Sequence, residues 1–219
     1  IDLLYSHRVL GIVVCSHIGE TMEHLDSNCP LISFEREIAE NIPAVLCDNY
    51  QGGILAADRL IDAGCRNIAI FNQPTKENIP AYSREKAFLK CCEDKKISGR
   101  VVYTDRLAPL SEEFGNNILE LLKKNSDLDG IFATSDVMAA NIIRACKKMG
   151  KRVPEDISIV GFDDTWISTL TYPSITTIHQ PVQEMCEYAI EAIVKKVKSE
   201  KVPSQVVFPV ELIDRESTK

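Results

Sequence analysis

The sequence lacks the short motifs that mark common catalytic and phosphate-binding sites. It contains no G-x-S-x-G, no Walker loop, no G-x-G-x-x-G and no H-E-x-x-H, which excludes the corresponding nucleophile elbows, phosphate cradles and zinc-protease helices. The four histidines, His7, His17, His24 and His179, have no obvious nucleophilic partner. We therefore expect a protein that is not an enzyme and that carries no cofactor.

The eight cysteines also lack the spacing of a metal or disulfide framework. No C-x-x-C occurs, and no pair of cysteines and histidines has zinc-site spacing. Cys15, Cys47 and Cys65 lie in or beside apolar runs, and Cys91 and Cys92 are adjacent on an expected helix. The pattern predicts buried, unpaired thiols in a reducing compartment, and therefore a cytoplasmic protein without a metal site.

Neither a basic patch nor a membrane segment is visible. The net charge is −7, and no run of Lys and Arg stands out, so the chain is a poor candidate for direct contact with DNA phosphates. No apolar run is long enough to span a bilayer, and no charged leader precedes an apolar stretch. We expect no membrane partner and no signal peptide.

Short apolar runs alternate with amphipathic stretches along almost the whole chain. Apolar runs separated by helices are typical of parallel sheets covered on both faces, so the sequence predicts a doubly wound α/β fold. Ser111 is expected to be the N-cap of its helix. The expected strands are 9–16, 31–34, 44–47, 67–72, 100–104, 130–134, 157–162, 175–180 and 205–212, and the expected helices are 51–63, 82–92, 111–124, 136–149 and 181–198.

Polar residues follow the expected strands, where ligands of such folds bind. Arg84 opens a helix soon after the strand 67–72. A carboxylate can accept protons from two hydroxyl groups, and an arginine fork can donate to two oxygens, so this set suits vicinal hydroxyls. The polar residues at or directly after the strand ends include Ser16, Glu35, Asp48, Ser135 and Asp163.

A structural interpretation competes with binding at each of these positions, because Asp, Asn and Ser after a strand also cap the next helix. We expect Asp136 to be a cap, whereas Asp48 suits either role. Asp163 is favoured as a ligand contact because the adjacent Asp164 could take the cap. Arg84 is the best single candidate, since no local structural need calls for a cation there.

Four stretches in this order resemble the lactose/galactose-repressor (LacI/GalR) family of transcription regulators. They are CDNYQGG at 47–53 with the following GCR at 64–66, GIFATSD at 130–136, VPEDISIVGFDD at 153–164 and PSITTIHQP at 173–181. With Arg84-x-x-x-Phe88, the similarity covers nearly the whole chain. The resemblance implies a type I periplasmic-binding-protein-like fold with two lobes, comprising 1–47 plus 181–202 and 48–180 plus 203–219.

The same resemblance implies an effector, a mono- or disaccharide, bound in the cleft between the lobes. It also implies a homodimer in which effector binding moves the lobes and changes the operator DNA affinity of an N-terminal helix-turn-helix. The implied effector contacts are Glu35, Asp48, Arg84, Ser135 and Asp163, together with Ser16 and Gln180.

The sequence departs from the family pattern in three respects. No helix-turn-helix is present, and the first lobe lacks its opening strand–helix units. The strand 9–16 would then expose an unpaired edge, and we expect the chain to belong to a longer protein. The loop 105–109 lacks the aromatic residue that often stacks on the sugar. Trp166 could supply that face, although it suits a core or interface position equally well.

A sugar-binding protein of an ABC transporter is the alternative function, because such proteins have a related fold. Transporter proteins of this kind are normally exported, whereas eight cysteines without evident pairing argue against an oxidising compartment. The motifs at 153–164 and 173–181 also favour a regulator. The leading prediction is therefore the effector-binding and dimerisation domain of a transcription regulator.

Overall fold

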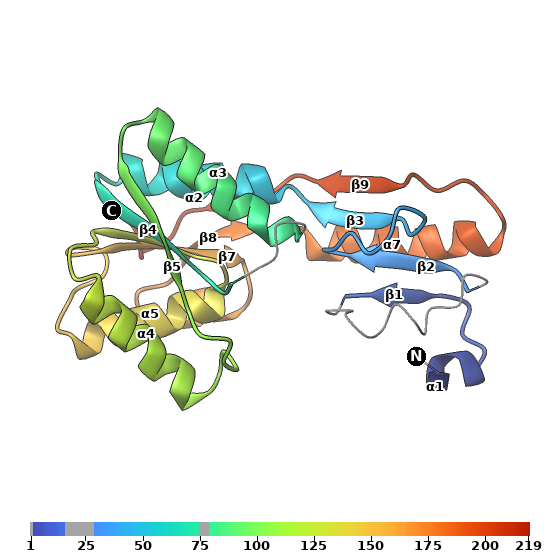
Figure 1. Ribbon diagram of the computed structural model, residues 1–219, viewed down its shortest axis with the longest axis horizontal. Helices are drawn as coiled ribbons and strands as arrows, with labels where there is room; N and C mark the ends of the chain where they lie inside the picture. The colour runs from blue at the N-terminus through green and yellow to red at the C-terminus, as the bar shows by residue number, and fades with distance from the viewer. Residues whose placement is uncertain (1, 16–28, 75–78) are drawn as a thin grey trace. The chain divides into compact units, whose positions relative to one another are not determined.

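The computed structural model describes residues 2–15, 29–74 and 79–219 and divides the chain into two compact units (Figure 1). The first unit takes Ile1–Asp48, Asn78–Pro80 and Pro181–Pro209, and the second takes Asn49–Glu77, Ala81–Gln180 and Val210–Lys219. The second unit resumes the C-terminal chain at residue 210 rather than at residue 203.

The second unit is a six-stranded sheet with the strand order β10-β8-β7-β6-β4-β5. All neighbouring strands are parallel except β10, which pairs antiparallel with β8. Its strands are β4 (Asn67–Asn72), β5 (Ser98–Tyr103), β6 (Gly130–Ala133), β7 (Ser158–Asp163), β8 (Thr176–His179) and β10 (Glu211–Ile213). Its helices are α2 (Asn49–Asp62), α3 (Pro80–Asp94), α4 (Glu112–Lys124), α5 (Asp136–Lys148) and α6 (Ile167–Leu170).

Helices cover both faces of this sheet, with α2 and α3 on one side and α4 and α5 on the other (Figure 1). Alternation along β6 explains this arrangement, because Ile131 joins the core formed with α4 and α5. The next residue, Phe132, faces the opposite side, where its ring centroid lies 5.9 Å from that of Phe88 and 6.3 Å from that of Phe162. The predicted doubly wound α/β fold is confirmed.

The first unit contains a parallel sheet in the order β1-β2-β3-β9. Gly11 precedes β1, and a Cβ there would lie 2.6 Å from Cγ2 of Ile193 on α7, so the close approach of strand and helix requires glycine. Ile12 and Val14 point away from that helix into a small core with Leu31. The elements are α1 (Asp2–Ser6), β1 (Ile12–Val14), β2 (Leu31–Phe34), β3 (Ala44–Cys47), α7 (Val182–Val197) and β9 (Gln205–Phe208).

The expected strand 205–212 is wrong as a single element. The chain forms β9 in the first sheet and β10 in the second, and Pro209 lies between them. Proline has no N–H for a strand ladder and restricts the residue before it, so it ends the pairing with β3. The expected strand 9–16 is shorter than predicted, and its last residue, Ser16, lies outside the described residues.

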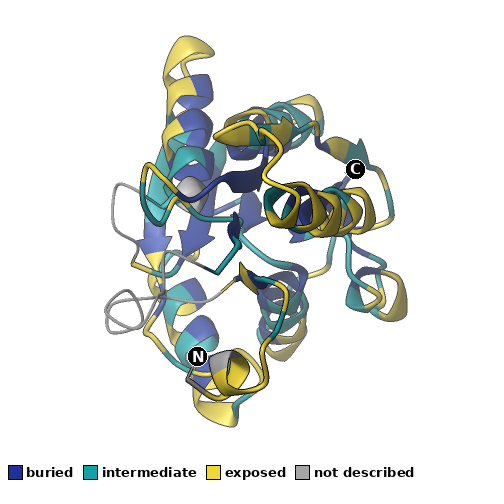
Figure 2. Cartoon of the chain, turned by 90° about the vertical axis from the view of Figure 1, so that its right-hand side faces the viewer, coloured by how far each residue is buried: buried dark blue, intermediate teal, exposed yellow. Residues whose placement is uncertain are grey.

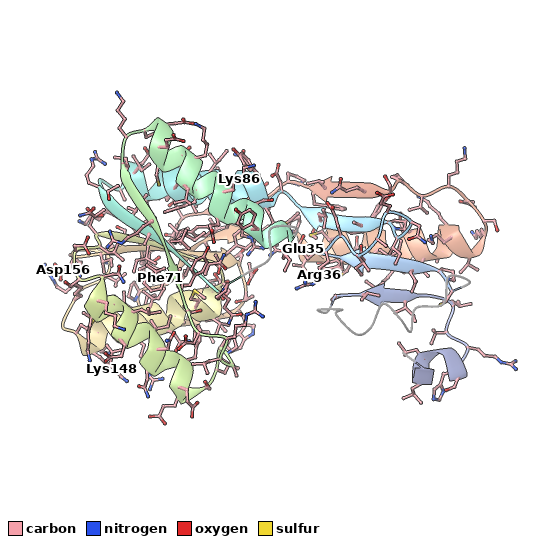
Figure 3. The ribbon with its side chains drawn as sticks, viewed as in Figure 1. Glu35, Arg36, Phe71, Lys86, Lys148 and Asp156 are labelled. Atoms are coloured by element: carbon pink, nitrogen blue, oxygen red, sulfur yellow. The ribbon has the colours of Figure 1, made fainter. Side chains whose placement is uncertain are left out.

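Buried and exposed positions follow the sheet and helix periodicities, with dark strands inside and exposed outer helix faces (Figure 2). Phe71 lies in the core of the second unit (Figure 3).

Burial raises the pKa of the Cys91 thiol to about 12 and that of Cys146 to about 11. The expectation of buried thiols is wrong for Cys15 and Cys186, which are exposed.

Candidate functional site

Four of the predicted site residues lie at the carboxyl ends of strands in the second unit. Asp163 ends β7, Ser135 follows β6, Gln180 follows β8, and Arg84 lies in the helix that follows β4. Because these strands are parallel, their carboxyl ends share one edge of the sheet. The second unit therefore carries a polar edge built from separate parts of the sequence.

Arg84 is a buried cation held by three elements. Its Cζ lies 3.4 Å from the centroid of the Phe162 ring, in the geometry of a cation–π contact. Nε donates to Oδ1 of Asn49 at 2.5 Å, and Nη1 donates to the carbonyl of Thr134 at 3.1 Å. The expectation that no local structural need calls for a cation here is wrong, since the guanidinium joins α2 and the ends of β6 and β7.

A second row of hydrogen bonds fixes the helix that carries Arg84. The Thr134 hydroxyl donates to Oδ1 of Asn72 at 3.2 Å, and Nδ2 of Asn72 donates to Oε2 of Glu85 at 3.1 Å. The Tyr103 hydroxyl donates to the other oxygen of Glu85 at 2.8 Å, and this bond raises the tyrosine pKa to about 12. These bonds tie α3 to the ends of three strands and so orient Arg84.

Asp163 and Asp164 form a strained turn after β7. Their φ angles are +105° and +57°, a region that residues with a Cβ occupy at a cost of about 1–3 kcal/mol each. Oδ1 of Asp163 accepts a hydrogen bond of 2.7 Å from Nε2 of Gln180. This bond joins two residues that the sequence predicted to be effector contacts.

Asp164 is held by a cationic partner and a histidine. Nη2 of Arg215 donates to its Oδ1 at 2.6 Å, and Nδ1 of His179 lies 3.0 Å from its Oδ2. Burial opposes ionisation of this carboxyl, but the hydrogen bond and charge of Arg215, with His179, hold its pKa below the ordinary value. Asp164 is therefore an ionised residue that anchors the strained turn to Arg215 and His179.

Ser135, rather than Asp136, is the N-cap of α5. Ser135 is extended, and its Oγ accepts a hydrogen bond of 3.2 Å from the Met138 amide. Asp136 is fully buried, and its carboxylate accepts from the Thr165 amide at 2.6 Å and the Thr177 hydroxyl at 2.6 Å. Desolvation raises the pKa of Asp136 above its ordinary value. The predicted cap role of Asp136 is wrong because its carboxylate is used to hold the turn after β7.

Trp166 is 71% exposed and directly precedes α6. This exposure rules out the core position that the sequence left open. Its proposed stacking role stays a prediction, as does the alternative of an interface position.

In the first unit, Glu35 and Asp48 follow β2 and β3. Glu35 has a φ of +53°, and its Oε1 accepts a hydrogen bond of 2.5 Å from the Cys47 amide; Figure 3 labels it at the end of β2. The Asp48 amide donates to the Phe208 carbonyl at 2.8 Å. Ser16 lies outside the described residues. The site roles of all three remain predictions.

The predicted set omits Asn49 and Phe162, which hold Arg84. Asn49 directly follows Asp48 and could have been found as a second polar residue at a strand end. No sequence signal separates Phe162 from an ordinary core residue, because its ring serves both the core and the cation.

Within residues 2–15, 29–74 and 79–219, no group of three or more His, Cys, Asp and Glu side chains is placed to hold a metal ion. In the same part of the chain, no helix is long and apolar enough to cross a membrane.

Asp164→Asn is expected to lower the free energy of unfolding by about 1–3 kcal/mol at pH 7, since it removes a charge-assisted hydrogen bond from a largely buried group. The pKa of Asp164 is depressed in the folded state, so its contribution is present above the unfolded pKa, about 3.9, and is lost as the pH falls through the folded pKa. Urea unfolding at pH 7 and pH 3 measures the difference between variant and wild type.

The control is Asp127→Asn, which removes an exposed ion pair with Arg100 and should change stability little. A destabilisation by Asp164→Asn that is the same at pH 7 and pH 3 would contradict the assigned anchoring role.

Known proteins that are similar to this chain include operon repressors and a LacI-type regulator. A family model described as "Periplasmic binding protein-like domain" matches residues 57–218. The chain is 31% identical over 220 residues to the ribose operon repressor of Halalkalibacterium halodurans, covering 100% of this chain and 65% of that relative. It is 29% identical over 212 residues to the sucrose operon repressor of Lactococcus lactis subsp. lactis, covering 96% and 64%. The chain thus spans just under two thirds of the length of these curated relatives.

Among solved structures, the chain resembles a periplasmic binding protein/LacI transcriptional regulator from Alkaliphilus metalliredigens QYMF complexed with D-xylulofuranose. The TM-score is 0.85 at 33% identity, and the match covers 100% of this chain and 81% of that one. The chain therefore belongs to the periplasmic-binding-protein-like domain family, in the form found in LacI-type transcription regulators.

Proposed function

We propose that this chain is the effector-binding part of a transcription regulator that responds to a mono- or disaccharide. The observation that carries the proposal is the fixed guanidinium of Arg84, which lies over Phe162, the residue directly before Asp163. The planar donor of Arg84 and the carboxylate of Asp163 thus both belong to the carboxyl edge of one sheet. This pairing suits the adjacent hydroxyl groups of a sugar.

The proposed contacts from the second unit are Arg84, Asp163, Ser135 and Gln180. Ser135 can serve both roles, because a hydroxyl that accepts a capping hydrogen bond still has a proton to donate. Gln180 both orients Asp163 and retains a carbonyl oxygen for a ligand hydroxyl. Glu35, Asp48 and Ser16 are proposed from the family resemblance, and Trp166 is proposed as a stacking surface.

The relatives' names support a role in transcription control. Both curated relatives are operon repressors, one of ribose and one of sucrose, and the solved relative was complexed with D-xylulofuranose. These names argue against the alternative of an ABC transporter's binding protein. We propose that the parent protein is a cytoplasmic homodimer. This chain has a net charge of −7 and is poorly suited to contact DNA phosphates, so we propose that operator DNA is contacted by residues outside it.

A thermal-shift titration with D-ribose, sucrose and D-xylulose tests the proposal. Binding to the folded state alone stabilises it by about 2.7 kcal/mol at 100 times the Kd, which corresponds to a rise in Tm of about 5–10 °C for a domain of this size. A saturable rise is expected with one of these sugars and not with sorbitol at the same concentration. A flat response to all three, confirmed by calorimetry, would contradict a site for this class of sugar.

Arg84→Lys and Asp163→Asn locate the site. Arg84→Lys replaces the planar guanidinium fork with a single ammonium group, and Asp163→Asn removes the negative charge of the acceptor. We therefore expect the Kd of the sugar identified above to rise at least about tenfold. The matched control is Arg100→Lys, which changes an arginine near the start of β5 that pairs with Asp127. Wild-type affinity in both site variants, measured by calorimetry, would show that the sugar binds elsewhere.

A further inference from the structure

Asp163 and Asp164 are two consecutive residues with a Cβ and a positive φ angle, so surrounding contacts must hold the turn in this conformation. Strain of this kind persists only where surrounding contacts over-determine the backbone. The turn presents Asp163, and its neighbour Asp164 points its carboxylate to the residues that hold it. Part of those contacts comes from the last residues of the chain.

The strongest of these contacts comes from Arg215, near the end of the chain. Its Nη2 donates to Oδ1 of Asp164 at 2.6 Å, while Nη1 donates to the Ser168 hydroxyl at 3.0 Å and to the Ile175 carbonyl at 2.9 Å. The side chain is only 18% exposed. One guanidinium therefore joins the turn, the fully buried Ser168 of α6 and the residue before β8.

The tail that carries Arg215 is itself fixed in the second unit. The Arg215 amide donates to the Thr176 hydroxyl at 2.9 Å, and the Ser217 hydroxyl donates to the Ile159 carbonyl at 2.6 Å. Arg59 of α2 also binds Asp214 and the Lys219 carbonyl. Hydrogen bonds before, at and after Arg215 therefore hold the tail segment that carries its guanidinium.

We propose that Arg215 is a positioning residue for effector binding, which holds Asp163 in its binding conformation through Asp164. This inference rests on the proposed function and extends it to the last residues of the chain, which are not among the predicted effector contacts. A lysine can replace this arginine only in part, because its ammonium group lacks the planar fork that bonds Asp164, Ser168 and the Ile175 carbonyl together. The C-terminal tail therefore sets the affinity of the site.

The chain contains an intrinsic fluorophore close to this turn. Trp166 is the single tryptophan and lies two residues after Asp164. Its emission anisotropy decay measures local motion of the turn without any ligand. This readout separates failure of the positioning role from failure of the proposed function.

The experiment compares Arg215→Gln and Arg215→Lys with Arg59→Gln, in the whole chain. Arg59→Gln is the matched control because it also releases a tail contact but leaves Asp164 and its partners in place. With D-ribose, sucrose or D-xylulose as the probe, whichever binds wild-type protein, we expect Arg215→Gln to raise the Kd about tenfold and Arg215→Lys to raise it less. Arg59→Gln should stay within about twofold of wild type.

Arg215→Gln should also increase the fast local component of the Trp166 anisotropy decay, whereas Arg59→Gln should not. Because Arg215 acts through Asp164, the double variant Asp164→Asn/Arg215→Gln should bind no more weakly than the worse of the two single variants. If Arg215→Gln fails to fold, Arg215→Lys carries the same two readouts.

Three results would overturn the proposal. They are an unchanged Trp166 decay in the Arg215 variants, equal weakening of binding by Arg59→Gln, and additive effects in the double variant. If wild-type protein binds none of the three sugars, the proposed function fails, and the Trp166 decay still decides whether Arg215 holds the turn.

Discussion

The polar edge of the second sheet is organised around one buried cation, the guanidinium of Arg84 over the ring of Phe162. Burying a charge is costly unless its hydrogen bonds are satisfied. Here the guanidinium donates to the Asn49 side-chain oxygen and to the Thr134 carbonyl, and its face lies on the Phe162 ring. Gly53 is part of the same constraint, since a Cβ there would lie 2.3 Å from the Arg84 carbonyl. The cation therefore fixes how α2 and α3 approach each other.

The turn after β7 is held by two carboxylates, whereas α2 and α3 are held by the Arg84 cation. Asp164 is paired with Arg215 and His179, whereas Asp136 uses both oxygens to hold Thr165 and Thr177. Gly161 makes room for this, because a Cβ there would lie 2.5 Å from Oδ1 of Asp136. A rigid donor and a rigid acceptor reduce the ordering that a ligand must impose, which is the general source of affinity in preorganised sites.

The sequence predicts the fold well because local patterns decide it. Strand β4 lies at the predicted residues 67–72, and Ser111 caps α4 with its hydroxyl 3.1 Å from the Phe114 amide. The pattern also predicts that Arg84 and Asp163 lie at strand ends, and the structure places Asp163 at the end of β7 and Arg84 in the helix after β4. The pattern does not predict contacts between side chains that lie far apart in the sequence. The contact of Arg215 with Asp164 joins residues 51 positions apart, and no local rule distinguishes such an arginine from a surface one.

In the proposed site the Arg84 guanidinium itself contacts the sugar. Its Nε–H is buried and bonded to Asn49, so it should exchange slowly and give a separate arginine side-chain resonance in a ¹H–¹⁵N spectrum. Titration with the bound sugar should shift the Arg84 Nε resonance along the same saturation curve as calorimetry, while the Arg100 resonance stays in place. Saturable binding with an unmoved Arg84 resonance would contradict the account.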